Sequence, residues 1–87
     1  MPGFVYILKG KNNHLYVGST NDLKRRIREH KLGKSKYTRN LRPLKLMFFQ
    51  KYHSLRKARM IEYRLKKLSR RDILERIIKE KIIKLGL

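Results

Sequence analysis

The chain of 87 residues is long enough for one small domain with a modest hydrophobic core. It contains 25 Lys and Arg residues against 6 Asp and Glu residues, which gives a formal net charge of +19 at pH 7. It has no cysteine, which excludes disulfides and thiolate metal sites, and no apolar run approaches the roughly 20 residues of a membrane-spanning helix. We therefore expect one domain comprising residues 1–87, an intracellular, cytoplasmic location and no membrane partner.

The excess of positive charge predicts a polyanionic partner, because each phosphate that pairs with a basic side chain releases condensed counterions. One alternative is that the lysine-rich surface only keeps a small protein soluble. Another is that the charged residues reflect adaptation to high temperature. We favour nucleic acid as the partner.

Two short apolar runs, residues 4–8 and 15–17, predict a β-hairpin. Successive side chains of a strand point to opposite faces of the sheet. This alternation favours a register in which Tyr6 lies opposite Tyr16, with a loop of Gly10–Asn12 between the strands. The other pairs of this register are Val5 with Val17 and Ile7 with Leu15. One face of the hairpin is then wholly apolar, and the two tyrosines share the other.

A charged helix is expected next, capped by Thr20 or Asn21 and ended by Gly33. Its inward stripe carries two polar residues, Arg26 and His30, among apolar ones. Because this stripe must dock on the sheet, both side chains point toward the strands. A pair of tyrosines that faces an arginine and a histidine predicts a reaction site.

Residues 34–42 are a basic segment with one aromatic ring, which suits phosphate contacts and the stacking of an unpaired base on Tyr37. An ordinary solvated loop is the alternative. The candidate nucleic-acid-binding residues are Lys34, Lys36, Tyr37, Arg39, Asn40 and Arg42.

A third strand, Leu44–Tyr52, follows this loop. Chain direction and the apolar first strand favour an antiparallel sheet with the first strand in the middle. Three strands alone are marginally stable, so helices must cover the sheet. We predict an α+β fold, a three-stranded antiparallel sheet flanked by helices, with an extra basic C-terminal helix at about residues 70–85.

Ser54 is expected to cap a second helix, in which Glu62 lies at helical spacing among apolar residues. A carboxylate in that place costs free energy unless it is paired or bound to a cation. Glu62 is therefore either the partner of Lys66, four residues on, or a metal ligand. Ser69 is expected to begin the last helix, whose apolar side packs back on the domain and whose other side is basic.

Together, Tyr6, the run Tyr16–Gly18, Arg26 and His30 resemble the signature of the GIY-YIG nuclease domain family, and the resemblance runs from residue 4 through about residue 68. This family includes the nuclease subunit of bacterial nucleotide excision repair, homing endonucleases and small single-domain proteins. One departure is Phe4, which stands where the first motif usually has glycine.

The resemblance implies a metal-dependent endonuclease, with DNA repair as one setting, and assigns roles to five residues. A tyrosine acts as general base, which requires that nearby positive charge lower its pKa. Tyr6 is our first choice for this role and Tyr16 the alternative. Arg26 would brace the phosphate oxygens, and His30 would polarise the attacking water or a phosphate oxygen. Glu62 would bind one Mg²⁺ ion, or Mn²⁺ in its place.

Two hypotheses follow. The first is a magnesium-dependent nuclease of low base specificity, because no recognition helix or zinc finger is attached. The second is a catalytically inactive, basic nucleic-acid-binding module. The complete set of site residues favours the nuclease, and DNA is favoured over RNA as its substrate. A homodimer or a protein partner is compatible with either hypothesis.

Overall fold

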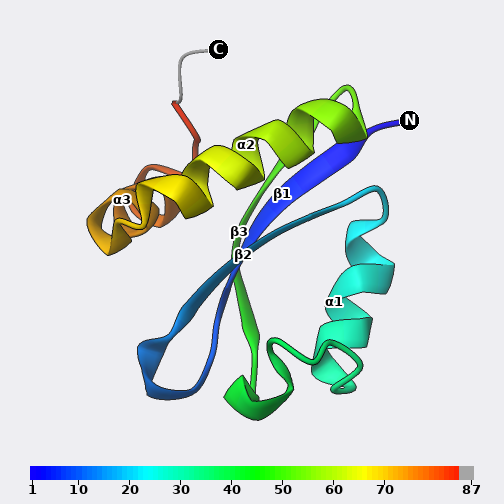
Figure 1. The fold of residues 1–87 in the computed structure, drawn as a ribbon, viewed down its shortest axis with the longest axis vertical. Helices are drawn as coiled ribbons and strands as arrows, with labels where there is room; N and C mark the ends of the chain where they lie inside the picture. Colours follow the sequence, from blue (N-terminus) through cyan, green and yellow to red (C-terminus); the bar gives the residue numbers. More distant parts are fainter. Residues whose placement is uncertain (85–87) are drawn as a thin grey trace.

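The computed structural model describes residues 1–84, which form a three-stranded antiparallel sheet and three helices (Figure 1). The central strand β1 pairs with β2 on one side and with β3 on the other, as predicted. The elements are β1 (Gly3–Lys9), β2 (Leu15–Thr20), α1 (Leu23–Lys31), β3 (Lys45–Tyr52), α2 (Leu55–Leu68) and α3 (Arg71–Glu80), with short 3₁₀ turns at Lys11–Asn13 and Arg39–Leu41. The predicted α+β fold class is confirmed.

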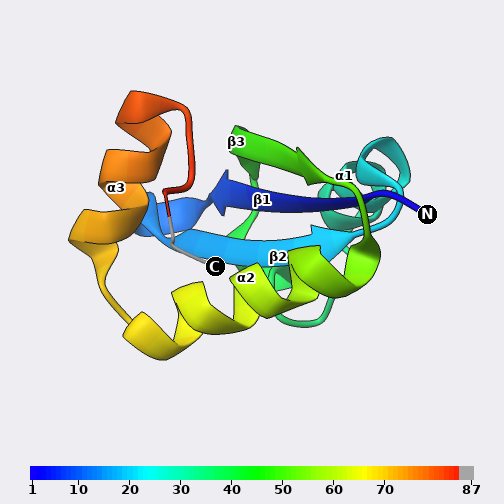
Figure 2. The ribbon, with the colours of Figure 1, turned by 90° about the horizontal axis from the view of Figure 1, so that it is seen from above.

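Helices cover both faces of the sheet, with α1 on one side and α2 and α3 on the other (Figures 1 and 2). Successive residues of β1 therefore enter different layers of the core. Val5 and Ile7 pack with residues of α2, whereas Tyr6 and Leu8 pack on the α1 side. These four residues, which form the middle of β1, are at most 1% exposed. Their burial explains why the strand is apolar on both faces.

The register of the hairpin differs from the prediction by two residues. Tyr6 lies opposite Gly18, and Leu8 lies opposite Tyr16. The loop has the expected three residues but lies one position later, at Lys11–Asn13, because Asn12 and Asn13 both adopt positive φ angles, 58° and 61°. A shift of two residues keeps every side chain on its predicted face, so Tyr6 and Tyr16 still share one face.

The N-terminal cap of α1 also differs from the prediction. Asp22 is the cap, and its carboxylate accepts a hydrogen bond from the backbone N–H of Arg25 at 3.1 Å. Thr20 instead accepts a hydrogen bond from the backbone N–H of Asp22 at 3.1 Å. A carboxylate at this position is favoured by the helix dipole as well as by the hydrogen bond.

Ser54 caps α2 as predicted, since its hydroxyl accepts a hydrogen bond from the backbone N–H of Lys57 at 3.2 Å. The prediction that Ser69 begins the last helix is wrong, because Ser69 adopts a left-handed conformation that ends α2. Lys81 adopts a similar conformation and ends α3, so this helix is shorter than predicted. The turn at Lys81 brings Ile83 into the core, where its backbone N–H donates to the side chain of Gln50 at 2.9 Å.

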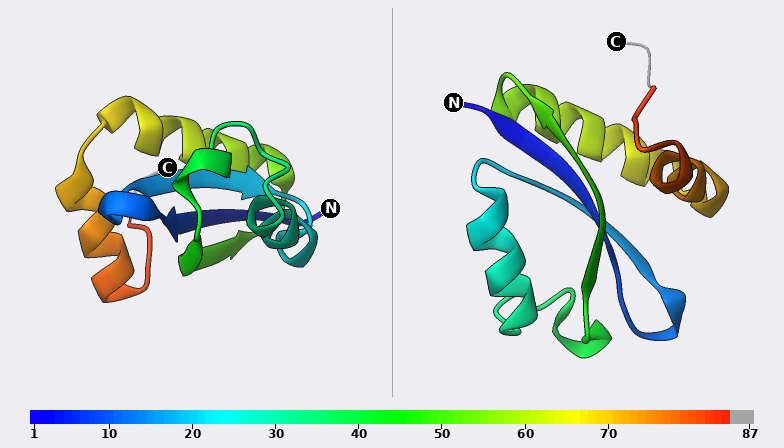
Figure 3. Two further views of the ribbon diagram at one scale, coloured as in Figure 1. Left: turned by 90° about the horizontal axis from the view of Figure 1, so that it is seen from below. Right: turned by 180° about the vertical axis from the view of Figure 1, so that it is seen from behind.

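The apolar side of α3 packs back on the domain as predicted, because Ile77 belongs to the core cluster that contains Val5 and Ile7. Figure 3 shows α3 following α2 at one end of the sheet. Residue 85, the last of the predicted helix, lies outside the described residues. Within residues 1–84, no helix combines the length and the apolar character that crossing a membrane requires.

Candidate active site

The candidate active site lies around β2, an edge strand that α1 and α2 approach from opposite faces of the sheet (Figure 1). Gly18 of β2 makes room for the side chain of Tyr6. A Cβ atom at residue 18 would overlap the Tyr6 hydroxyl and would lie 2.5 Å from the ring carbon that bears it. The absence of a side chain here therefore lets the Tyr6 ring lie close over the backbone of β2.

A chain of buried hydrogen bonds connects β1, α1 and the loop after α1. The Tyr6 hydroxyl lies 2.9 Å from Nε2 of His30, and Nδ1 of His30 lies 2.7 Å from Oγ1 of Thr38. The three side chains are between 0% and 1% exposed. The hydrogen bonds satisfy both ring nitrogens, which is necessary for an imidazole that is removed from water.

Burial raises the pKa of Tyr6 to about 12, although a hydrogen bond from Arg26 acts in the opposite direction. Burial outweighs the positive charge at Tyr6, so this tyrosine does not have the lowered pKa that the general-base role requires. Burial, together with the charge of Arg26, lowers the pKa of His30 to about 4. His30 is therefore neutral at pH 7 and carries one ring proton, so one of its nitrogens donates and the other accepts.

Arg26 lies beside these buried residues, but its side chain is 30% exposed. One of its terminal nitrogens donates to Oε1 of Glu29 at 2.9 Å. Glu29 lies three residues further along the same helix, so the ion pair forms within α1. Arg26 thus keeps a fixed position at the boundary between the core and the solvent.

Tyr16 is the more accessible of the two tyrosines, and its ring is partly exposed. The ring centroid lies 5.4 Å from that of His30 in an edge-on arrangement. The Nζ atom of Lys66 on α2 lies 5.3 Å from the same centroid. Tyr16 therefore connects the buried residues of the α1 side with the charged residues of α2.

Glu62 approaches β2 from α2, and its side chain is 20% exposed. Its Oε2 atom lies 2.7 Å from Nζ of Lys66. This is the ion pair that the sequence suggested as the alternative to a metal-binding role for Glu62. Its Oε1 atom accepts a hydrogen bond from the hydroxyl of Ser19. Carboxylate and hydroxyl oxygens suit a hard divalent cation such as Mg²⁺, which commonly retains several waters and uses one or two protein carboxylates. Within the described part of the chain, no three His, Asp or Glu side chains form a metal-binding group.

The structure thus brings Tyr6, Tyr16, Arg26 and His30 together, with Lys66 between Tyr16 and Glu62. Two partners of the site were not identified from the sequence, Ser19 and Thr38, whereas Lys66 was named there as the possible ion-pair partner of Glu62. A partner such as Thr38 could have been anticipated from the sequence, because a histidine whose side chain points into the core needs a hydrogen-bond partner for each ring nitrogen. Ser19 could not, because its contact with Glu62 joins residues 43 positions apart.

The predicted nucleic-acid-binding residues lie apart from Glu62. Their loop runs beside the C-terminal end of α1, on the α1 side of the sheet (Figure 3). Tyr37 is 72% exposed, and Nζ of Lys36 lies 5.4 Å from its ring centroid. The exposed members are Lys34, Lys36, Tyr37, Arg39, Asn40 and Arg42.

Comparison with known proteins agrees with the resemblance that the motifs indicate. A model of the GIY-YIG catalytic domain matches residues 2–77. UPF0213 protein CPE1444 of Clostridium perfringens is 45% identical over 82 residues, which cover 93% of this chain and 87% of that protein. UPF0213 protein YazA of Bacillus subtilis is 44% identical over 69 residues, or 78% of this chain and 70% of that one.

A solved structure supports the same relationship. The solution NMR structure of UPF0213 protein BH0048 from Bacillus halodurans matches with a TM-score of 0.61 and 38% sequence identity, over 93% of this chain and 86% of that chain. Sequence and fold therefore agree over most of the described residues. On these grounds, the chain belongs to the family of GIY-YIG catalytic domains, and its relatives are small UPF0213 proteins.

Proposed function

We propose that this protein is a metal-dependent nuclease that hydrolyses phosphodiester bonds in nucleic acid, DNA in preference to RNA, with low base specificity. Membership of the GIY-YIG family indicates nuclease activity. The observation that carries the proposal is the meeting of Tyr16, Lys66 and Glu62 beside the group of Tyr6, His30 and Arg26. The net charge of +19 favours a polyanionic substrate.

Tyr16 is the better candidate for the general base. A base must reach the water whose proton it takes, and Tyr16 is partly exposed whereas Tyr6 is 1% exposed. A pKa of about 12 also keeps the Tyr6 hydroxyl protonated. We therefore assign Tyr6 and His30 as positioning residues that hold the Tyr16 ring and Arg26 in place.

Arg26 is suited to bracing the non-bridging oxygens of the scissile phosphate. Its guanidinium offers several N–H donors in one plane, and the ion pair with Glu29, at 2.9 Å, occupies one of its terminal nitrogens. Charge-assisted hydrogen bonds of this kind stabilise the negative charge that builds up in the transition state.

Glu62 and Ser19 are the residues that would hold one Mg²⁺ ion, or Mn²⁺ in its place. When bound, the ion would neutralise charge on the phosphate and on the leaving oxygen. Lys66 now occupies Oε2 of Glu62. On ion binding, its ammonium group would be available to contact the phosphate instead.

One observation favours the second candidate function, a catalytically inactive nucleic-acid-binding module. Both carboxylate oxygens of Glu62 already have protein partners, Lys66 and Ser19, so Glu62 does not require a metal ion to be stable. In a binding module the same residues would serve the fold, and the basic surface would serve the function.

The two candidates are separated by a cleavage assay. The protein is incubated with end-labelled single-stranded, duplex and branched DNA and with RNA, each with Mg²⁺, Mn²⁺ or EDTA. Arg26→Ala and Glu62→Ala are tested beside Lys24→Ala, an exposed residue of α1 with no assigned role. Cleavage that requires metal and is lost only in the first two variants supports the nuclease. Binding without cleavage of any substrate supports the binding module.

A further inference from the structure

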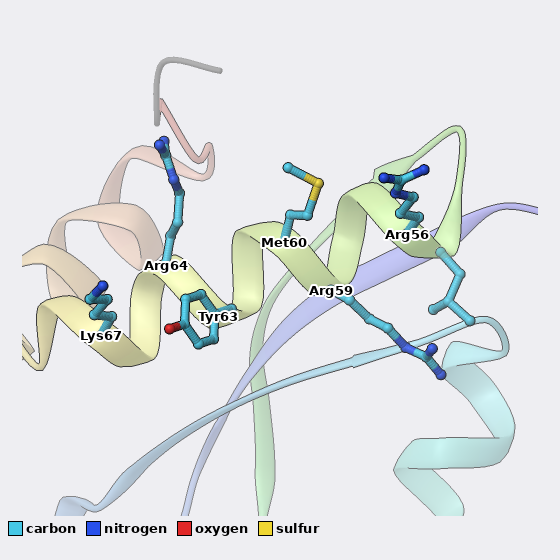
Figure 4. Close-up of a pocket in the computed structure, with 7 residues that line it drawn as sticks. Arg56, Arg59, Met60, Tyr63, Arg64 and Lys67 are labelled. Atoms are coloured by element: carbon cyan, nitrogen blue, oxygen red, sulfur yellow. The ribbon is translucent and has the colours of Figure 1, made fainter.

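The outer face of α2 carries a basic and aromatic surface that neither the core nor the candidate site uses. An open hollow of about 550 Å³ lies along this face (Figure 4). We call its principal residues the α2 strip: Arg56, Arg59, Met60, Tyr63 and Lys67. The opposite side of the same helix fixes it to the sheet through Ala58, Ile61 and Leu65.

Two large side chains of the α2 strip are exposed although burial would favour them. Tyr63 is 65% exposed and Met60 is 49% exposed. The Nζ atom of Lys67 lies 5.8 Å from the centroid of the Tyr63 ring, within cation–π range. Because Tyr63 contributes little to the core, its ring is available as a flat surface for a ligand.

The charge of this hollow indicates the chemistry of its occupant. Of the seven residues that line it, four are arginine or lysine and none is acidic. Phosphates complement the cations, and a base complements an exposed aromatic ring, which is the pattern of surfaces that bind single strands. A duplex satisfies only the cations, because its bases are already stacked on one another.

We propose that the α2 strip binds an unpaired nucleic-acid strand, with Tyr63 stacked on a base and Arg56, Arg59 and Lys67 in contact with phosphates. The inference rests on the proposed function in one respect, namely that the strand is taken to be part of the substrate. From Arg56 to Lys67 the helix rises about 16 Å, a length along which a strand can contact more than one of the cations.

The α2 strip adjoins the candidate metal ligand, because Tyr63 directly follows Glu62 in the chain. Lys66, the next turn of the same helix, contacts both Glu62 and the Tyr16 ring. A strand that lies on the α2 strip therefore passes beside the proposed cleavage site. The substrate class is nucleic acid with an unpaired segment, such as a flap, a branch or a free single strand, in preference to continuous duplex.

The test is equilibrium binding without chemistry, measured by fluorescence anisotropy in EDTA. The probes are a labelled single strand of about 16 nucleotides and the matched duplex, compared at about 0.1 M salt and then over a series of salt concentrations, because affinity depends on ionic strength. Tyr63→Ala is compared with Tyr63→Phe, which keeps the aromatic ring. Lys79→Gln, an exposed charge on α3, is the control for Arg59→Gln.

We expect Tyr63→Ala to weaken single-strand binding about fivefold or more, as the loss of one base-stacking contact requires, and to change duplex binding less than about twofold. Tyr63→Phe should bind like the wild type. Arg59→Gln should weaken binding to both probes and flatten the salt dependence by about one phosphate contact, more than Lys79→Gln does. Equal losses for both probes, or none, in Tyr63→Ala would overturn the inference.

Two further outcomes separate this inference from the proposed function. Single-strand binding that depends on Tyr63 in a protein that cleaves nothing would support the inference and contradict the nuclease. Metal-dependent cleavage with unchanged binding in Tyr63→Ala would overturn the inference and leave the nuclease intact. A dimer in sedimentation that Tyr63→Ala dissociates would also overturn it, because a second copy would then cover the α2 strip.

Discussion

The hydroxyl of Tyr6 lies 2.9 Å from Nε2 of His30, and both side chains are buried. This contact joins the central strand of the sheet to the inward face of α1. Through the second nitrogen of His30, which lies 2.7 Å from Oγ1 of Thr38, it also fixes the loop that follows the helix. The polar group that supports the candidate site is therefore also part of the core.

Replacing His30 should strongly destabilise the fold. His30→Ala leaves the buried hydroxyls of Tyr6 and Thr38 without their partner and opens a cavity, so we expect a loss of about 2–4 kcal/mol in the free energy of unfolding. Thr38→Val keeps the volume and removes one hydrogen bond, and should cost about 1–2 kcal/mol. Urea denaturation measures both. A His30→Ala protein as stable as Lys24→Ala would contradict this account of the buried hydrogen bonds.

The stability of the protein should depend on pH through His30. The pKa of His30 is lowered from 6.5 to about 4 by burial and by the charge of Arg26, so the unfolded state takes up a proton first as the pH falls. Stability is therefore complete above about pH 6.5 and decreases from there to about pH 4. Between pH 7 and pH 5 the expected loss is about 2 kcal/mol.

The matched control for this pH dependence is His30→Gln, which keeps a polar side chain but does not titrate. Its free energy of unfolding, measured by urea denaturation at the same pH values, should change less than that of the wild type. Identical slopes in the two proteins would show that His30 does not cause the pH dependence.

The two tyrosines should respond differently to loss of their hydroxyls. If Tyr16 is the general base, Tyr16→Phe should lower the single-turnover cleavage rate by about 10²–10⁴-fold, the usual contribution of a positioned base. Tyr6→Phe should lower stability by about 1 kcal/mol, because it loses the hydrogen bond to His30, and should retain more activity. The reverse order of cleavage rates would assign the base to Tyr6.

Lys66 should compete with a divalent cation for Glu62. Its Nζ atom lies 2.7 Å from Oε2 of Glu62 in a partly exposed ion pair. Exposed pairs contribute up to about 1 kcal/mol, so Lys66→Ala should tighten Mn²⁺ binding by about two- to fivefold. Isothermal titration calorimetry without nucleic acid measures this affinity. Weaker binding in Lys66→Ala than in Lys67→Ala would mean that Lys66 supports the metal site instead of competing for it.

Much of the fold could be predicted from the sequence because its signals are local or periodic. The uninterrupted apolar run of β1 indicated a central strand, and Ser54 marked the start of α2. The hairpin register was predicted wrongly because two registers fit the apolar pattern almost equally well. A shift of two residues keeps the faces of the hairpin, so the alternation of side chains could not distinguish the two registers.

The site was less predictable, because its properties depend on contacts between distant residues. Helical spacing indicated that Arg26 and His30 face the sheet, and the structure places His30 against Tyr6. Spacing carries no information about burial depth, however, so the raised pKa of Tyr6 was not foreseen. The link from Glu62 to Tyr16 through Lys66 likewise requires the packing of α2 against β2.

The most direct test of the proposed nuclease is the single-turnover cleavage rate of Glu62→Gln beside the wild type, with Mg²⁺ and with protein in excess over an end-labelled DNA. Glutamine keeps the size of the side chain and one acceptor oxygen but removes the charge that a cation requires. We predict that cleavage is abolished while DNA binding in EDTA remains within about twofold of the wild type. Metal-dependent cleavage at the wild-type rate in Glu62→Gln would contradict the assignment of Glu62 as the metal ligand, and with it the proposed site.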